Sequence, residues 1–141
     1  MLKPIMDELV LFESTPLDIQ VKGRSRLFLV KLLLIIADEP ARLTILNCQG
    51  HAANFGCPMC DYFFERHPTF NATIFHTKSV SDTNLNLLKN QDWRQTISDL
   101  EERRNNGQNV EQEHGIKGAC QVSRLPYVDL VTICPPECMH S

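Results

Sequence analysis

The stretch Leu32-Leu33-Leu34-Ile35-Ile36-Ala37-Asp38 decides the predicted fold, because six consecutive apolar residues end on an acid. A short, continuous apolar run of this kind is typical of a strand that is buried on both faces of a sheet. Such a strand would place Asp38 at its carboxyl end, where α/β folds commonly hold the residues that bind ligands. Pro40 would then open a short helix through Ala41 to Leu46. We therefore predict an α/β protein.

The elements before this strand are short. Apolar and acidic residues at helical spacing predict a helix from Pro4 to Phe12. A brief strand is expected over Ile19-Gln20-Val21, and Gly23-Arg24-Ser25 would form the turn into a second strand from Leu27 to Ala37. Together these two strands predict a hairpin, from which Asp38 leaves the sheet.

A longer helix is predicted over residues 82–105. Its apolar residues are spaced for one helical face, a Ser-Asp pair precedes it, and Gly107 would stop it. The residues of that apolar face are Leu85, Leu88, Trp93, Ile97 and Leu100.

Composition limits the classes of function. The 141 residues suit one domain, 43% of them are hydrophobic, and the formal net charge is −3 with a pI near 5.9. Proteins that bind DNA unaided usually carry a basic face, so contact with DNA would need positive charge from other domains or from a metal ion. The longest apolar run has eleven residues and contains Lys31, too short and too charged to cross a membrane. The start of the chain lacks the apolar core of a signal peptide, so an intracellular, reducing compartment is expected.

Residues 48–76 lack periodicity, which predicts a long loop. A loop of this length usually needs a stabilising cross-link, and a metal ion would be one. Cys57-Pro58-Met59-Cys60 supplies two soft ligands at the spacing of a zinc knuckle, whereas a complete structural zinc site has four ligands. His51 and His76 are the preferred candidates for the other two, with His67 and Cys48 also in reach along the chain. Two alternatives remain open, a pair of buried core cysteines and a redox-active pair.

Two acids stand in or beside apolar runs. Asp38 ends one, and Asp129 lies within Leu125-Pro126-Tyr127-Val128-Asp129-Leu130-Val131. Carboxylates from separate strands hold paired Mg²⁺ ions in phosphoryl-transfer nucleases. The alternative is that each acid is an ordinary strand-end or turn residue. Glu137 and His140 place a carboxylate and an imidazole near the end of the sequence, where a surface tail is the alternative. No nucleophile elbow or glycine-rich phosphate loop is present, so acyl transfer and nucleotide hydrolysis are not supported.

Several motifs together resemble the core of cut-and-paste transposases of the CACTA (En/Spm) type. Ala37-Asp38-Glu39-Pro40-Ala41-Arg42, Gly50-His51 and Phe55-Gly56-Cys57-Pro58-Met59-Cys60 resemble that family's A-D-x-P-A-R and G-x-x-G-C-x-x-C motifs. Gly115-Ile116-Lys117-Gly118, Leu125-Pro126-Tyr127-Val128-Asp129 and Pro136-Glu137-Cys138-Met139-His140-Ser141 resemble its G-(V/I)-K-G, L-P-Y-F-D and P-I-D-Y-M-H-C motifs. The motifs cover nearly the whole chain in the family's order.

The resemblance implies a partial RNase H-like mixed sheet over residues 1–141, with flanking helices and a zinc-knuckle-like loop insertion at 48–76. It also implies an enzyme that nicks and joins DNA with Mg²⁺ or Mn²⁺ held by a DDE/D acid triad. Asp38 matches the first acid and Asp129 the second, while Glu137 and His140 fall on the D-x-x-H signature. The implied partners are DNA and either a second copy of the chain or another protein, in the nucleus.

Three departures from the family pattern shape the expected function. Glu137 replaces an aspartate, Asn54 stands where the family usually differs, and the sequence ends at Ser141, before the region of the third acid. We also expect that no DNA-binding domain precedes Met1. We therefore expect an interior slice of a transposase that is inactive alone. The alternative is a small zinc-stapled interaction module for protein or nucleic acid, in which the acids are structural.

Overall fold

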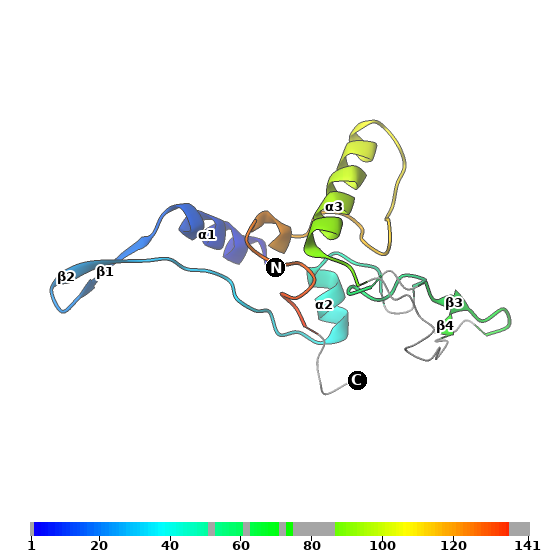
Figure 1. The fold of residues 1–141 in the computed structure, drawn as a ribbon, viewed down its shortest axis with the longest axis horizontal. Helices are drawn as coiled ribbons and strands as arrows, with labels where there is room; N and C mark the ends of the chain where they lie inside the picture. Colours follow the sequence, from blue (N-terminus) through cyan, green and yellow to red (C-terminus); the bar gives the residue numbers. More distant parts are fainter. Residues whose placement is uncertain (1, 51–52, 61–62, 71–72, 75–86, 136–141) are drawn as a thin grey trace.

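A computed structural model describes residues 2–50, 53–60, 63–70, 73–74 and 87–135 of the chain. Within these ranges the protein has mixed α/β content, with three α-helices, one 3-10 turn and two antiparallel pairs of strands. The shape is elongated, with the β1–β2 hairpin at one end, the β3–β4 pair at the other and the helices between them (Figure 1). The pair at the second end is small, since β3 spans Glu65–Arg66 and β4 spans Thr73–Ile74. The prediction of α/β content is confirmed in this coarse form.

Helix α1 spans Lys3–Ser14, which confirms the first predicted helix. Pro4 stands in its first turn, where the missing N–H has no helical partner to lose. Met6 faces the core with 2% of its surface exposed. Asp7 forms an ion pair of 2.6 Å with Arg124, the last residue of the 3-10 turn η1 (Val122–Arg124). These contacts dock α1 on η1.

The predicted hairpin is present, formed by β1 (Leu17–Val21) and β2 (Arg24–Phe28). Its turn is Lys22–Gly23, one residue earlier than predicted. Both residues have positive φ, 50° and 72°, which is the conformation that a two-residue hairpin turn requires. Glycine adopts it without strain, so Gly23 belongs inside the turn and Arg24 already pairs with Val21.

The predicted long strand from Leu27 to Ala37 is wrong. β2 ends at Phe28, and residues 29–38 continue in no regular strand within the described part of the chain. The apolar run is also not buried on both faces, because Leu33 is 86% exposed and Ile36 is 80% exposed. A strand is buried on both faces only when layers of structure cover both of them.

The opposite side of this segment does contact the core. The N–H of Ile35 donates to the carbonyl oxygen of Ile133 at 2.8 Å, and the N–H of Leu32 donates to the Tyr127 hydroxyl at 2.9 Å. Lys31 lies over the Tyr127 ring, 4.9 Å from its centre. Segment 29–38 therefore packs along residues 127–133 by one side.

Helix α2 spans Glu39–Ile45, as predicted, whereas α3 spans Asn90–Asn105 and not 82–105. Residues 82–86 lie outside the described residues, and 87–89 are not helical. The N–H of Leu88 donates to the carbonyl oxygen of Met59 at 2.9 Å, so a tertiary contact takes the hydrogen bond that a longer helix would need. Gly107 follows the end of α3 with φ of 79°, as the predicted stop requires.

The core lies where α1, α2 and α3 meet the segment from Ile116 to Cys134. Trp93 and Leu100 of α3 are at most 1% exposed, and Leu46 beside α2 is 2% exposed. The described residues of the predicted apolar face of α3, Trp93, Ile97 and Leu100, all point into this core, and Leu88 packs against it from just before the helix. This core carries the two acids on its surface, one at the start of α2 and one in the turn after η1.

Candidate functional site

Asp38 caps the N-terminus of α2. Its Oδ1 accepts the N–H of Ala41 at 2.9 Å, and its backbone is extended, with φ of −63° and ψ of 165°. Asp is among the best residues for this position, because its side chain pairs a helical N–H that has no partner within the helix. The structure thus places Asp38 at a helix start and not at the edge of a sheet. The side chain is exposed, and it lines a surface groove of about 770 Å³ with Thr44 and Gln121.

Asp129 is an exposed residue in a turn, not in a strand. Its Oδ1 accepts the N–H of Val131 at 2.9 Å, and its carbonyl oxygen accepts the N–H of Ile133 at 2.8 Å. Helix α3 holds the residues on both sides of it. Arg94 Nη2 donates to the carbonyl oxygen of Val128 at 2.7 Å, and Asn90 Oδ1 accepts the N–H of Leu130 at 3.0 Å.

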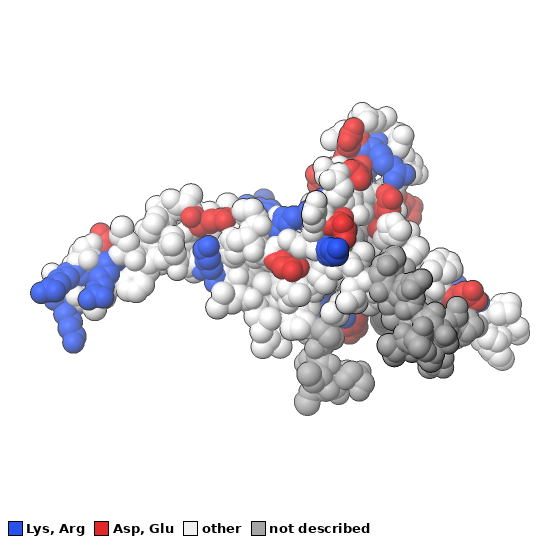
Figure 2. Space-filling view, in the orientation of Figure 1, with Lys and Arg blue, Asp and Glu red and all other residues white. Residues whose placement is uncertain are grey.

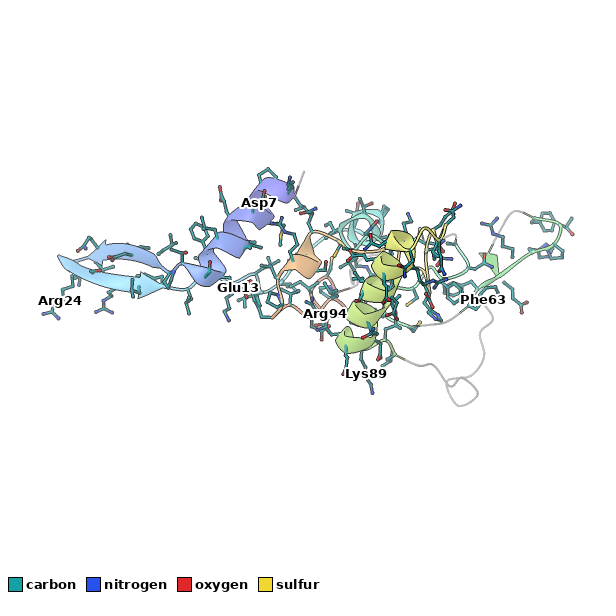
Figure 3. All side chains as sticks on the ribbon, turned by 90° about the horizontal axis from the view of Figure 1, so that it is seen from above. Asp7, Glu13, Arg24, Phe63, Lys89 and Arg94 are labelled. Atoms are coloured by element: carbon teal, nitrogen blue, oxygen red, sulfur yellow. The ribbon has the colours of Figure 1, made fainter. Side chains whose placement is uncertain are left out.

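Arg94 is the main clamp of this turn, and it lies between α3 and the segment that it holds (Figure 3). Its Nη1 donates to the carbonyl oxygen of Ser123 at 3.0 Å, and its Nη2 also donates to that of Leu125 at 2.9 Å. Three carbonyl groups from Ser123 to Val128 therefore depend on one guanidinium. Because these carbonyls have no strand partner, the clamp sets the path of the chain into Asp129.

The segments that carry the two acids lie side by side. The hydrogen bond between Ile35 and Ile133 joins the run that ends at Asp38 to the turn that begins at Asp129. Within the described residues, no three side chains of the ligating types His, Cys, Asp and Glu come together. The structure therefore brings the two segments together, but it shows no cation site among the described residues. Glu137 and His140 lie outside the described residues.

The cysteine pair forms a tight turn. Cys57 Sγ accepts hydrogen bonds from the Cys60 thiol and from the N–H groups of Met59 and Cys60. These bonds, led by the Cys60 thiol and helped by the positive charge of Arg42, lower the pKa of Cys57 to about 6, although burial opposes them. These contacts favour the thiolate of Cys57, the form that binds metals and reacts as a nucleophile.

This chemistry fits half of a tetrahedral zinc site, since two thiol ligands stand at the required spacing. The preferred partners, His51 and His76, lie outside the described residues. His67 uses its Nδ1 to accept the N–H groups of Thr69 and Phe70, both at 3.1 Å, so it is engaged in a turn. Cys48 is buried beside Ile116, and burial raises the pKa of its thiol to about 12.

The cysteine turn is held against the rest of the protein by aromatic and backbone contacts. Phe55 packs edge-on against Phe63 at 5.2 Å and against His114 at 5.6 Å between ring centres. Gly115 approaches the Phe55 carbonyl so closely that a Cβ there would overlap its oxygen. Gly115 of the Gly115-Ile116-Lys117-Gly118 motif is thus packed against Phe55, two residues before Cys57.

Sequence reasoning gave Arg42 no role of its own. It is 5% exposed, and its Nη2 pairs with Glu39 at 2.5 Å, whereas its Nε and Nη1 are buried without a hydrogen-bond partner among the described residues. Its positive charge acts to lower the pKa values of the Cys57, Cys48 and Cys134 thiols. Burial outweighs this effect at Cys48 and Cys134, whose pKa values are raised. The available signal was its place on the inward stripe of α2, three residues after Glu39 and four before the buried Leu46.

No family model, no curated protein and no solved structure matches the chain. Across the described ranges, none of the helices combines the length and apolar character needed to cross a bilayer.

Proposed function

We propose that this chain belongs to the catalytic core of a CACTA-like transposase, with an RNase H-like fold and DNA as its substrate. The observation that carries the proposal is the pairing of Ile35 with Ile133, which sets the Asp38 and Asp129 segments side by side. Both acids are exposed, as residues that meet a metal ion and DNA must be. The order of motifs along the sequence supports the same assignment.

The exposed face of segment 29–38 supports an RNase H-like sheet. Leu33 and Ile36 present apolar side chains to solvent, while Ile35 and Leu32 are tied to the core. Apolar side chains of this kind are normally covered by another layer of structure. In this proposal a further part of an RNase H-like domain covers this side of segment 29–38, and the nucleus is where the protein acts.

The proposed activity needs divalent cations, which would stabilise the attacking and leaving oxygens of phosphoryl transfer. In this chain Asp38 and Asp129 would each contribute a carboxylate, and Glu137 with His140 would add to the same site. Because the described residues alone do not complete a cation site, we expect weak metal binding by the isolated chain and no nicking of supercoiled DNA.

Mn²⁺ binding followed by electron paramagnetic resonance tests this proposal. The double variant Asp38→Asn/Asp129→Asn should bind Mn²⁺ at least about tenfold more weakly, because each carboxylate contributes charge as well as an oxygen ligand. Asn is as good a helix cap as Asp, so a loss of Mn²⁺ at position 38 reports on ligation and not on folding. Glu101→Gln on the exposed side of α3 is the matched control and should bind like the wild type.

Equal Mn²⁺ binding by the wild type and the double variant would contradict the assignment. Nicking by the wild-type chain that disappears in Asp38→Asn would support the role of Asp38 but overturn the expected inactivity.

The second candidate function is a zinc-stapled interaction module, favoured by the Cys57 thiolate and its N–H donors. It predicts one zinc ion per chain and melting upon chelation, because structural zinc contributes roughly 10–16 kcal/mol in small domains. Zinc content by mass spectrometry under native conditions tests it, with Cys57→Ser as the variant that should lose the ion. A folded preparation without zinc would eliminate this candidate.

A further inference from the structure

The β1–β2 hairpin projects from the body of the protein as an arm (Figure 1). Every residue of both strands except Leu17 is exposed, so the hairpin does not contribute to the core. Lys and Arg side chains gather at its far end (Figure 2), and Arg24 lies at its tip (Figure 3). A two-stranded hairpin without a buried face is only marginally stable in water. Because the arm adds nothing to the core, we look for its role in the binding of a partner.

The register shows which side chains share a face. Val21 pairs with Arg24, Ile19 with Arg26 and Leu17 with Phe28. Directly paired residues point to the same face of a two-stranded sheet, so this face alternates apolar and arginine side chains. The side chain of the arm's one acid, Asp18, accepts a hydrogen bond from the Ser25 hydroxyl on the opposite face. The arginine face is therefore free of negative charge.

Charge complementarity identifies the partner as a polyanion. The arm carries Lys22, Arg24 and Arg26 against the single acid Asp18, while the whole chain has a formal net charge of −3. The hairpin therefore concentrates positive charge that the net charge of the whole chain does not reveal. Arginine and lysine on an exposed strand pair are the groups that contact phosphates of nucleic acids.

Shape favours duplex DNA among polyanions. Strands in a pair lie about 4.8 Å apart, and a two-stranded ribbon fits the major groove of B-DNA, which is about 12 Å wide. The major groove of A-form RNA is too deep and narrow for side chains to read. An anionic membrane is disfavoured as the partner. The tip of the hairpin is the charged turn at Lys22–Gly23 with Arg24, whereas Ile19 and Phe28 lie further from the tip, so apolar side chains would not be the first to enter a bilayer.

We propose that the β1–β2 hairpin is a DNA-binding arm that enters a groove of the duplex with its arginine face. Arg24, Arg26 and Lys22 contact backbone phosphates, while Ile19 and Phe28, which are 45% and 42% exposed, pack against the groove wall. The inference rests on the proposed function only for the choice of DNA as the partner.

Fluorescence anisotropy with a labelled 20-base-pair duplex tests the arm, using the full chain in EDTA. The wild type should bind in the range of about 1–100 µM that is typical of sequence-independent contacts. Lys22→Gln/Arg24→Gln/Arg26→Gln should bind about tenfold to a hundredfold more weakly at low salt. The slope of log K against log salt should fall by about 2.7, because each lost phosphate contact removes about 0.9.

The matched control removes the same charge elsewhere. Lys3→Gln/Arg66→Gln/Lys117→Gln changes three exposed basic residues outside the arm and should retain wild-type affinity. Circular dichroism of both triple variants should match the wild type, since all six residues are exposed. Equal binding by the two triple variants, or no binding by the wild type, would overturn the proposal. Preferential binding of the arm to an RNA stem or to phosphatidylserine vesicles would also overturn it.

The two proposals fail separately. EDTA removes divalent cations, so the anisotropy result does not depend on the acids. Asp38→Asn/Asp129→Asn should bind the duplex at least as tightly as the wild type, because only negative charge is lost. If the wild type and Asp38→Asn/Asp129→Asn bind Mn²⁺ equally while the arm still binds DNA, the arm proposal is supported and the catalytic proposal is contradicted. If the acids bind Mn²⁺ and the arm does not bind DNA, the catalytic proposal is supported and the arm proposal is contradicted.

Discussion

Asp38 and Asp129 are both exposed acids on the same core, but different kinds of contact hold them. Asp38 caps its own helix through Ala41, three residues away in the sequence. The turn of Asp129 is held from a distance, because Arg94 and Asn90 of α3 bind the residues on both sides of it. The first acid is therefore positioned locally, whereas the position of the second depends on the packing of α3. Perturbations of α3 should thus affect Asp129 and leave Asp38 in place.

The largest effect is expected for Arg94→Leu. It leaves the carbonyl groups of Ser123, Leu125 and Val128 without their donor, so the free energy of unfolding should fall by about 3–5 kcal/mol. Urea denaturation measures this loss. Arg103→Leu is the control on the same helix. Its side chain is 43% exposed in an ion pair with Glu113, so it should cost less than about 1 kcal/mol. Equal losses of stability in the two variants would show that the three hydrogen bonds of Arg94 do not contribute more than an exposed ion pair.

A second pair of variants compares a glycine required only by its backbone conformation with one that is also required by tertiary packing. Gly107 and Gly115 have nearly the same φ, 79° and 80°, but only Gly115 packs against Phe55. Gly107→Ala should cost about 1–2 kcal/mol from backbone strain alone. Gly115→Ala adds overlap with the Phe55 carbonyl and should cost about 2–4 kcal/mol. Thermal melting ranks the two variants, and an equal cost would mean that the close approach of Phe55 adds no constraint at Gly115.

Asp38→Ala tests the local side of the comparison. Loss of the cap should destabilise the protein by about 1 kcal/mol, while Asp38→Asn should be close to neutral, because asparagine caps a helix equally well. Chemical denaturation of both variants measures the difference. A large loss in Asp38→Asn would show that the negative charge, and not the cap, is what the fold uses.

The last test concerns the reactivity of Cys57, which is again held by neighbours in the sequence. Its pKa in the folded protein, about 6, lies below the ordinary value of 9.0. The thiolate therefore stabilises the fold fully above pH 9, and this contribution is lost as pH falls through 6. The rate of alkylation by iodoacetamide should follow a titration centred near pH 6. Cys60→Ala removes the leading hydrogen bond and should raise that midpoint, whereas an unchanged midpoint would contradict the assigned cause.

The elements that sequence reasoning predicted well are those whose signals are local. α1, α2, the hairpin and the stop of α3 near Gly107 follow from prolines, apolar spacing and positive-φ turns. The errors lie where a distant partner decides. Residues 87–89 are not helical because Leu88 bonds to Met59, and segment 29–38 is not a buried strand because only one of its sides meets the core.

The candidate site divides in the same way. The cysteine spacing and the acids at 38 and 129 were visible in the sequence, but Arg42 and Arg94 were not assigned roles. A buried arginine on an amphipathic helix looks like any exposed one until its neighbours are known. Likewise, the net charge of −3 hid the basic arm, because a total does not record where charges gather.

The sequence by itself determined the capped start of α2, the type of hairpin turn and the Cys57–Cys60 turn, because each depends on backbone preferences and hydrogen bonds within a few residues. Only the tertiary structure decided that residues 29–38 show one face to solvent, that Arg94 holds the Asp129 turn and that the arginine face of the arm stands clear of the core. Those outcomes depend on burial and on partners far along the chain, which spacing in one sequence does not encode.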